Sequence, residues 1–329
     1  MTKLLGRFAT SIAAVLVGGL ALPAQAALTL TAAGITDGFT LSLFVDSAPN
    51  TGYCCGPLGI ATNSLGQVVV QNYASHTNSV FSDVDGQHWS MAISAAPFTS
   101  TSYGAAITNS GGTLYATNND AGQIVYRLNP NGSINTALTT TGAGGHGIWT
   151  NPVTGHLVAA NGSVINDIDQ GTGTFSTIVH NVDVDGVSVS NDGSTIYGAS
   201  GGHVFGWNYL GAQVYDSGNL GTPDGTGVIG GNNLFTGDII ANANDGTVWL
   251  LDPVHHTSVV IASGGSRGDY VGVDSTNGTL FLTQTDSVYR LACGPDCFFT
   301  PPVPEPETYA LMLGGLALIG ALKRRRQHR

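Results

Sequence analysis

One short pattern recurs six times along the middle of the chain. Each unit has a glycine, a short apolar strand, a turn containing Asn, Asp or Gly, and a second apolar strand. The leading glycines are 45, 43, 39, 41 and 45 residues apart, a period near 43. That period is typical of a four-stranded propeller blade, whereas the repeats of β-helices are shorter. The pattern therefore predicts a six-bladed β-propeller whose units begin at Gly59, Gly104, Gly147, Gly186, Gly227 and Gly272.

The composition of this middle part supports an all-β fold. The chain has 329 residues and ten Lys and Arg, and seven of these lie in its first seven or last seven residues. Both glutamates, Glu305 and Glu307, also lie near the C-terminus, so the middle has 19 Asp and three Arg, a formal charge of −16. Without Glu or Lys it lacks two strong surface helix formers. The absence of a basic surface also disfavours nucleic acid as a partner.

One strand lies outside the six units and completes the ring. The sixth unit runs from its third strand, which ends at Leu291, into Cys293 and Pro295 without a fourth strand. The apolar stretch Thr40–Val45 precedes the first unit and has no blade of its own. We expect it to be the outer strand of the last blade, because pairing the two chain ends closes the ring. The propeller domain is thus predicted over residues 27–300.

The N-terminal 26 residues have the features of a secretory signal peptide. Lys3 and Arg7 precede an apolar stretch, and Ala24-Gln25-Ala26 supplies a small-residue cleavage site. The other interpretation, a retained membrane anchor, is disfavoured because the apolar stretch is short for a span. We therefore expect residues 1–26 to be removed and the body to be exported.

The C-terminal residues 301–329 combine three elements in a fixed order. A Pro-Glu-Pro motif is followed by the apolar run Tyr309–Leu322 and then by a basic cluster. This order resembles the PEP-CTERM sorting signal of Gram-negative bacteria that make exopolysaccharide. The resemblance implies recognition by a membrane-embedded transpeptidase, an exosortase, then transient anchoring of residues 309–322 in the inner membrane and transfer to the cell surface or extracellular matrix. The residues that match the motif and the cytoplasmic basic cluster are Pro304, Glu305, Pro306, Arg324, Arg325 and Arg326.

The apolar run of this signal is short for a permanent anchor. Its 14 residues reach only about 21 Å as a helix, against about 30 Å for a bilayer core. A hydrophobic C-terminal helix of this length can hold the chain briefly, which suits a segment that is cut off. The alternative is a permanent tail anchor with no further purpose.

The body resembles the six-bladed group that includes NHL-repeat, gluconolactonase-like and streptogramin-lyase-like propellers. The matching pieces are Gly38-Phe39-Thr40-Leu41 with Phe44, and Gly56-Pro57-Leu58-Gly59-Ile60-Ala61 with Leu65-Gly66-Gln67-Val68. The resemblance implies the fold and not the function, because propellers of this kind serve many purposes.

The four cysteines should be oxidised in an exported chain. If Thr40–Val45 closes the last blade, its six residues separate Cys293 from Cys54 and Cys55 by about 20 Å, too far for a disulfide. The sequence therefore favours a local Cys293–Cys297 bridge. Cys54 and Cys55 then either form an adjacent pair or stay free.

The residues that enter the innermost strands are the candidates for function, because these loops surround the central channel of a propeller. They can bind a divalent cation such as Ca²⁺ or a polar sugar, although Asp and Gly also simply make tight turns there. Asp183 and Asp185 lead into one innermost strand and are the best candidates for a cation site. The predicted channel residues are Tyr103, His146, Asp185, Asp224, Asp269 and Tyr270.

Two functions from different classes are compatible with these features. The first is a non-enzymatic binding module on the cell surface or in the exopolysaccharide matrix. The second is a propeller hydrolase or lyase for a small sugar or cyclic ester, with His146 as a base assisted by Asp185. The body has no Glu, whereas the gluconolactonase-like enzymes hold their metal with a carboxylate set that includes one, so this departure favours the binding module.

Overall fold

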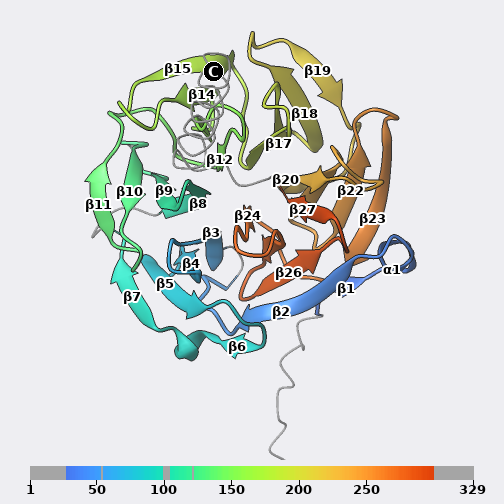
Figure 1. Cartoon of the computed structure of the whole chain (residues 1–329), viewed down its shortest axis with the longest axis horizontal. Coiled ribbons are helices and arrows are strands. Elements are labelled where there is room, and N and C mark those ends of the chain that lie inside the picture. Colours follow the sequence, from blue (N-terminus) through green and yellow to red (C-terminus); the bar gives the residue numbers. More distant parts are fainter. Residues whose placement is uncertain (1–26, 53–54, 99–103, 121, 300–329) are drawn as a thin grey trace, which may run out of the picture.

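Six β-sheets surround a central axis in the computed structural model, which describes residues 27–52, 55–98, 104–120 and 122–299 (Figure 1). Each blade has four antiparallel strands, and its first strand is the innermost. The all-β six-bladed propeller expected from the repeat is therefore confirmed. The signal peptide and the C-terminal sorting signal lie outside the described residues. Within the described ranges, no helix is long and apolar enough to cross a membrane.

The blades follow one another along the chain, with bounds close to those of the repeat. Blade one comprises β3 (Pro57–Thr62), β4 (Gln67–Asn72), β5 (Thr77–Ser82) and β7 (Ser94–Pro97). Blade two comprises β8 (Gly104–Ser110), β9 (Thr113–Asn118), β10 (Val125–Leu128) and β11 (Ile134–Ala137). Blade three comprises β12 (Ile148–Thr150), β13 (Leu157–Ala160), β14 (Val164–Ile168) and β15 (Phe175–His180).

The second half of the ring repeats this arrangement. Blade four comprises β16 (Val187–Val189), β17 (Thr195–Ser200), β18 (His203–Asn208) and β19 (Gln213–Asp216). Blade five comprises β20 (Pro223–Gly231), β21 (Ile239–Ala243), β22 (Val248–Asp252) and β23 (Thr257–Ser263). Blade six comprises β24 (Val271–Val273), β25 (Leu280–Thr283), β26 (Val288–Ala292) and, as its outer strand, β2 (Thr40–Asp46).

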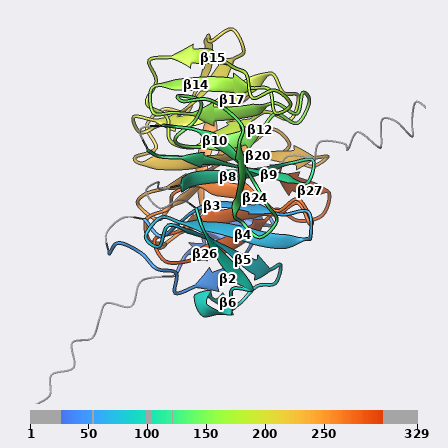
Figure 2. The ribbon, with the colours of Figure 1, turned by 90° about the vertical axis from the view of Figure 1, so that its left-hand side faces the viewer.

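The core lies between the blades. Inner strands such as β13 and β21 are buried at every residue, because neighbouring blades cover both of their faces. Outer strands are partly exposed, as in β19. Figure 2 shows the ring from the side, with the strands of successive blades stacked from top to bottom of the view.

The repeat glycines are required by the close approach of neighbouring inner strands. A Cβ atom on Gly147, Gly186 or Gly225 would lie 2.5 Å from a backbone carbonyl oxygen of the next blade. No real Cβ tolerates such a contact, so these positions accept only glycine. In blade five the glycine of closest approach is Gly225, and not Gly227 as the spacing of the repeat suggests. The glycines of the repeat therefore mark the positions at which neighbouring blades pack against each other.

Closure by the N-terminal strand is confirmed. β2 pairs antiparallel with β26, with Thr40 opposite Ala292 and Leu41 opposite Leu291. Three short strands that the repeat does not predict add to the closure. These are β1 (Thr29–Leu30), which pairs with β23, β6 (Gln87–His88), which pairs parallel with β2, and β27 (Cys297–Phe299), which pairs with β20. The short helices α1 (Ala32–Thr36) and η1 (Trp89–Met91) lie in the connections to β2 and β7.

A disulfide links the last two strands of the chain. Cys293 and Cys297 form a disulfide with their Cα atoms 5.5 Å apart, which joins the end of β26 to β27. Cys55 is also in a disulfide. Cys54 lies outside the described residues.

The join between blades six and one contains a buried ion cluster around Arg290. The guanidinium of Arg290 donates to Asp274 of its own blade and to Asp83 and Asp85 in the β5–β6 turn of blade one, with an Nε–Oδ1 distance of 2.8 Å to Asp85. It lies 4.7 Å from the ring centroid of Phe281 and 5.3 Å from that of Phe44. The segment Asp83-Val84-Asp85-Gly86 lies between β5 and β6, where the chain turns.

Candidate functional site

The mouth of the channel is formed by residues at equivalent positions in successive blades. His146, Asp185, Asp224 and Asp269 each stand just before the residue at which the inner strands of neighbouring blades meet. The Gly147 amide donates to the Asp185 carbonyl at 2.7 Å, and the Gly186 amide donates to that of Asp224 at 3.1 Å. These bonds hold the entrance positions of blades three, four and five side by side, and the Asp269 carbonyl of blade six lies next to Gly225 of blade five. We call these four residues, together with Arg267, the mouth cluster.

His146 of blade three and Asp185 of blade four lie within ion-pair distance of each other. The Nδ1 atom of His146 lies 2.6 Å from Oδ1 of Asp185, and the two side chains are 19% and 52% exposed. A Cβ on Gly162 would lie 3.2 Å from the other ring nitrogen, Nε2. That nitrogen therefore faces the β13–β14 turn of blade three, beside the backbone of Gly162.

Arg267 joins the two buried carboxyl groups of the cluster. Its Nε atom donates to Oδ1 of Asp269 at 2.9 Å, and its Nη2 atom lies 3.7 Å from Oδ2 of Asp224. The Asp224 and Asp269 side chains are 4% and 3% exposed, and each has one oxygen without a hydrogen-bond partner. Burial raises the pKa of both carboxyls, and the negative charges of Asp269 and Asp185 raise the pKa of Asp224 further.

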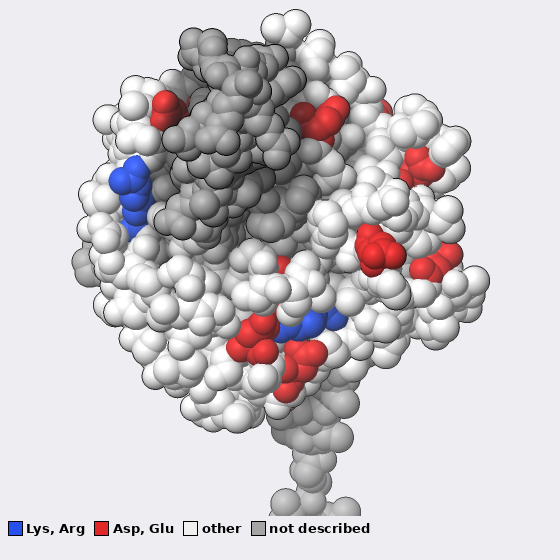
Figure 3. Space-filling model, viewed as in Figure 1, with Lys and Arg blue, Asp and Glu red and all other residues white. Residues whose placement is uncertain are grey.

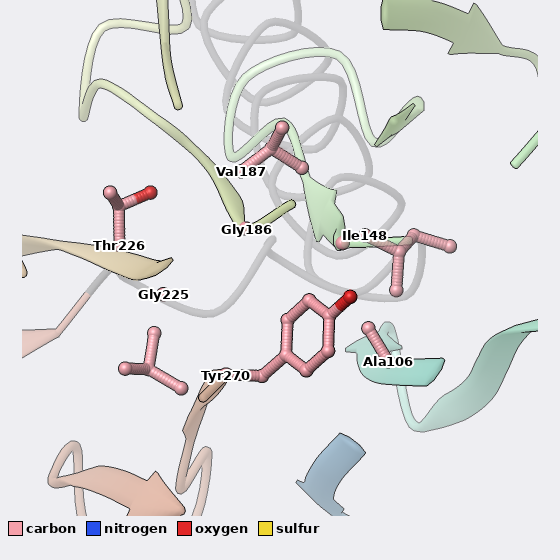
Figure 4. A pocket seen from close by; sticks show the side chains of 9 residues that line it. Ala106, Ile148, Gly186, Val187, Gly225, Thr226 and Tyr270 are labelled. Atoms are coloured by element: carbon pink, nitrogen blue, oxygen red, sulfur yellow. The ribbon is translucent and has the colours of Figure 1, made fainter. Parts of the chain in front are cut away.

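Tyr270 closes the channel beneath the cluster. Its ring extends from blade six toward Ile148 and Ala106 on the other side of the channel (Figure 4). The cavity left between it and the inner strands has about 10 Å³, room for roughly one water molecule. Burial raises the pKa of the Tyr270 hydroxyl well above its usual range, as do the nearby Asp185, Asp224 and Asp269. A ligand therefore meets the mouth and not an open channel.

The residues predicted from the sequence are only partly brought together. Tyr103 lies outside the described residues. Asp183 is exposed and is not part of the mouth cluster, and no three His, Cys, Asp or Glu among the described residues are placed to hold a metal ion. Sequence reasoning missed Arg267. A usable signal existed, because Arg267 is one of three arginines in the body and lies two residues before Asp269.

Pairing of His with Asp is common in this molecule. Nδ1–Oδ distances of 2.5 to 2.7 Å also occur in three pairs in blades three, four and five, none of them on an innermost strand. The geometry of His146 and Asp185 therefore does not by itself mark a catalytic site. The three other pairs are His156–Asp167, His203–Asp216 and His255–Asp252.

Comparison with known families identifies the C-terminus. Residues 302–327 match the PEP-CTERM protein-sorting motif. The chain carries a PEP-CTERM sorting signal. This signal implies export, recognition by an exosortase and transient membrane anchoring before surface display. None of the curated proteins matches the sequence.

Solved structures that resemble the chain include two lyases and a putative gluconolactonase. A streptogramin B lyase is 15% identical, with a TM-score of 0.54, and the match covers 77% of this chain and 97% of the lyase. Virginiamycin B lyase from Staphylococcus aureus is 14% identical, with a TM-score of 0.53 and coverages of 77% and 99%. A putative gluconolactonase is 15% identical, with a TM-score of 0.59 and coverages of 84% and 99%. At such identities the likeness shows the fold alone.

Proposed function

We propose that this PEP-CTERM propeller is a surface-displayed binding module that holds a sugar of the exopolysaccharide matrix at the mouth of its channel. The observation that supports this most directly is the Arg267 bridge between Asp224 and Asp269. Carboxylate and guanidinium groups together accept from and donate to sugar hydroxyls. Because Tyr270 closes the channel below, the ligand rests on the mouth and does not thread through the ring.

The test compares two arginine variants that are expressed as the full chain and purified in their sorted form from the surface of producing cells. Retention on the matrix polysaccharide of the same cells is measured by co-sedimentation. We expect Arg267→Met to weaken retention at least about tenfold, because a charged hydrogen-bond donor is lost. Arg127→Met is the matched control, because Arg127 lies in blade two and donates to the Gln170 carbonyl far from the mouth. Equal retention of both variants would overturn the proposal.

A hydrolase or lyase acting on a small sugar or cyclic ester is the second candidate. The His146–Asp185 pair supports it, because a carboxylate on Nδ1 is how a general base is held in position. Two features favour the binding module instead, namely the Nε2 atom facing Gly162 and the repetition of such pairs outside the channel.

Turnover of a panel of lactones and cyclic depsipeptides distinguishes the two candidates. A binding module gives the same rate with the His146→Ala, Asp185→Ala double variant as with the unchanged protein. A rate that depends on these residues would establish the enzyme. The control is His203→Ala, which removes a similar pair on the outer part of blade four.

A further inference from the structure

The two faces of the ring differ in their exposed apolar side chains. The entry face carries the mouth cluster, and the exit face is the opposite one, where the innermost strands end and the third strands turn into the fourth. Among the described residues, ten large apolar side chains are more than half exposed. Six of these stand in turns of the exit face, namely Leu65, Val84, Val153, Leu210, Leu234 and Val254.

Two of the other four also lie on this side. Ile35 is in α1, which precedes the start of β2 at this face. Val214 is the second residue of β19, which begins there. Met91 and Ile93 follow β6, which pairs with the entry end of β2, so these two lie outside the exit face. Single exposed apolar residues need no explanation, but the gathering of eight of the ten on one face does. Leu234 and Leu210 are the most prominent, at 96% and 93% exposed.

The chain leaves the described structure at this same face. β27 pairs with the last residues of β20, with Cys297 opposite Gly231 and Phe299 opposite Ile229. The Phe299 amide donates to the Gly278 carbonyl at 2.9 Å, in the β24–β25 turn of the exit face. Only nine residues, 300–308, separate Phe299 from the apolar run that begins at Tyr309. Even fully extended they reach about 30 Å.

We propose that the exit face rests on the membrane surface while the sorting signal anchors the chain, and that removal of the signal releases it. The short connection holds the face near the bilayer at an effective concentration of about millimolar, so weak insertion of a few apolar turns is enough. Once the connection is cut, this advantage is lost. The mouth cluster faces away from the membrane in the anchored state.

The charges of the exit face make apolar insertion the dominant contact. Arg290 is enclosed by Asp83, Asp85 and Asp274, so it is not available to anionic lipids. On the face seen in Figure 3, acidic side chains lie in separate spots around the ring and basic ones are few. Docking should therefore be stronger on zwitterionic than on anionic lipid.

The test uses the full-length protein reconstituted in phosphatidylcholine vesicles whose acyl chains carry a fluorescence quencher. A thiol-reactive fluorophore is placed on Leu210→Cys or Leu234→Cys, and on Asp245→Cys in the exposed β21–β22 turn of the entry face as the control. We expect quenching of at least about half at positions 210 and 234 and none at 245. Replacing a third of the lipid by phosphatidylglycerol should reduce the quenching.

Two results would overturn the proposal. One is equal quenching at both faces. The other is crosslinking of Leu234→Cys between copies without quenching, which would make the exit face a contact between protomers. Release is tested with protein collected from the cell surface after sorting. Less than about a tenth of this protein should sediment with vesicles at about 1 mM lipid. Sedimentation equal to that of the anchored chain would contradict release.

Discussion

Burial and hydrogen bonding shift the pKa values of carboxyl groups of this acidic protein in opposite directions. Asp238, at the start of β21 beside Asp252, is partly buried, and no hydrogen bond to its carboxyl is described. Burial and the charge of Asp252 raise the pKa of Asp238 to about 7, while His255 acts in the opposite direction. Asp192 is the contrasting case. Hydrogen bonds from Ser190 and Ser194 hold the pKa of Asp192 below its ordinary value.

We predict that Asp238 makes the protein less stable as the pH rises through neutrality. A carboxyl whose pKa is higher in the folded than in the unfolded state contributes stability below about pH 4, which is lost as the pH rises through 7. Asp238→Asn should therefore be more stable than the unchanged protein at pH 8, by about 1 to 2 kcal/mol after solvent screening, and equally stable at pH 4. Urea unfolding at several pH values measures this.

For the control variant, Asp192→Asn, we expect a change in stability of the opposite sign. Asp192→Asn should be less stable at pH 8, and the difference should shrink as the pH falls below 4, because a depressed pKa stabilises the ionised form. A gain at pH 8 for Asp192→Asn, or none for Asp238→Asn, would contradict this account.

For single residues, the sequence predicts which positions lie around the channel better than it predicts which side chains contact one another there. His146, Asp185, Asp224 and Asp269 lie at equivalent positions in successive blades, because the repeat fixes where each chain segment enters its blade. Arg267 belongs to no repeat position, and its contacts depend on the loop from β23 to β24. The closure of the channel by Tyr270 also depends on how the rings of side chains pack across the axis.

Among the elements, the pairing of β2 with β26 inside blade six has the least help from chain connectivity, because the two strands come from opposite ends of the chain. β2 completes blade six from the far end of the chain, and the Arg290 cluster links that blade to the β5–β6 turn. Arg290 is 9% exposed at its side chain and Asp274 is fully buried. A buried cation shared by three carboxyls is strongly disturbed when one partner is removed.

We predict that Arg290→Met lowers the free energy of unfolding by about 3 to 5 kcal/mol, because Asp274, Asp83 and Asp85 lose their shared cation. Arg127→Met, which removes a single interaction with a carbonyl, should lower it by only about 1 kcal/mol. Adding Asp274→Asn to Arg290→Met should recover part of the loss. Urea denaturation compares the three variants, and equal losses for the two arginines would refute a special role of the join between blades six and one.

The elements that the sequence misses are those without a repeat. The period predicts all six blades, and an unpaired apolar strand predicts the closure by β2. β1, β6 and β27 have only two or three residues each. Such short strands have no periodicity of their own, and they form because the neighbouring edge of a blade presents free backbone groups.

At the scale of the whole molecule, the acidic residues and the basic residues are separated along the chain. The body is acidic, and most of the basic residues lie at the two ends of the sequence. The described body has a formal charge of −16 from 19 Asp and three Arg, and two of these arginines are engaged with aspartates. Such a body repels an anionic polysaccharide and not a neutral one. The mouth cluster can therefore bind neutral sugars without a metal ion, whereas binding to an anionic matrix requires a bridging cation.

We predict that retention on an anionic polysaccharide requires calcium or magnesium, and that retention on a neutral one does not. Divalent cations shared between carboxylates of the polymer and exposed aspartates such as Asp183 would remove the repulsion. Co-sedimentation is measured with alginate and with dextran, each in 1 mM calcium or in excess EDTA. EDTA should reduce retention on alginate at least about tenfold and leave dextran unchanged. Retention on alginate that persists in EDTA would rule out bridging, and Asp183→Asn tests whether the cation meets this residue.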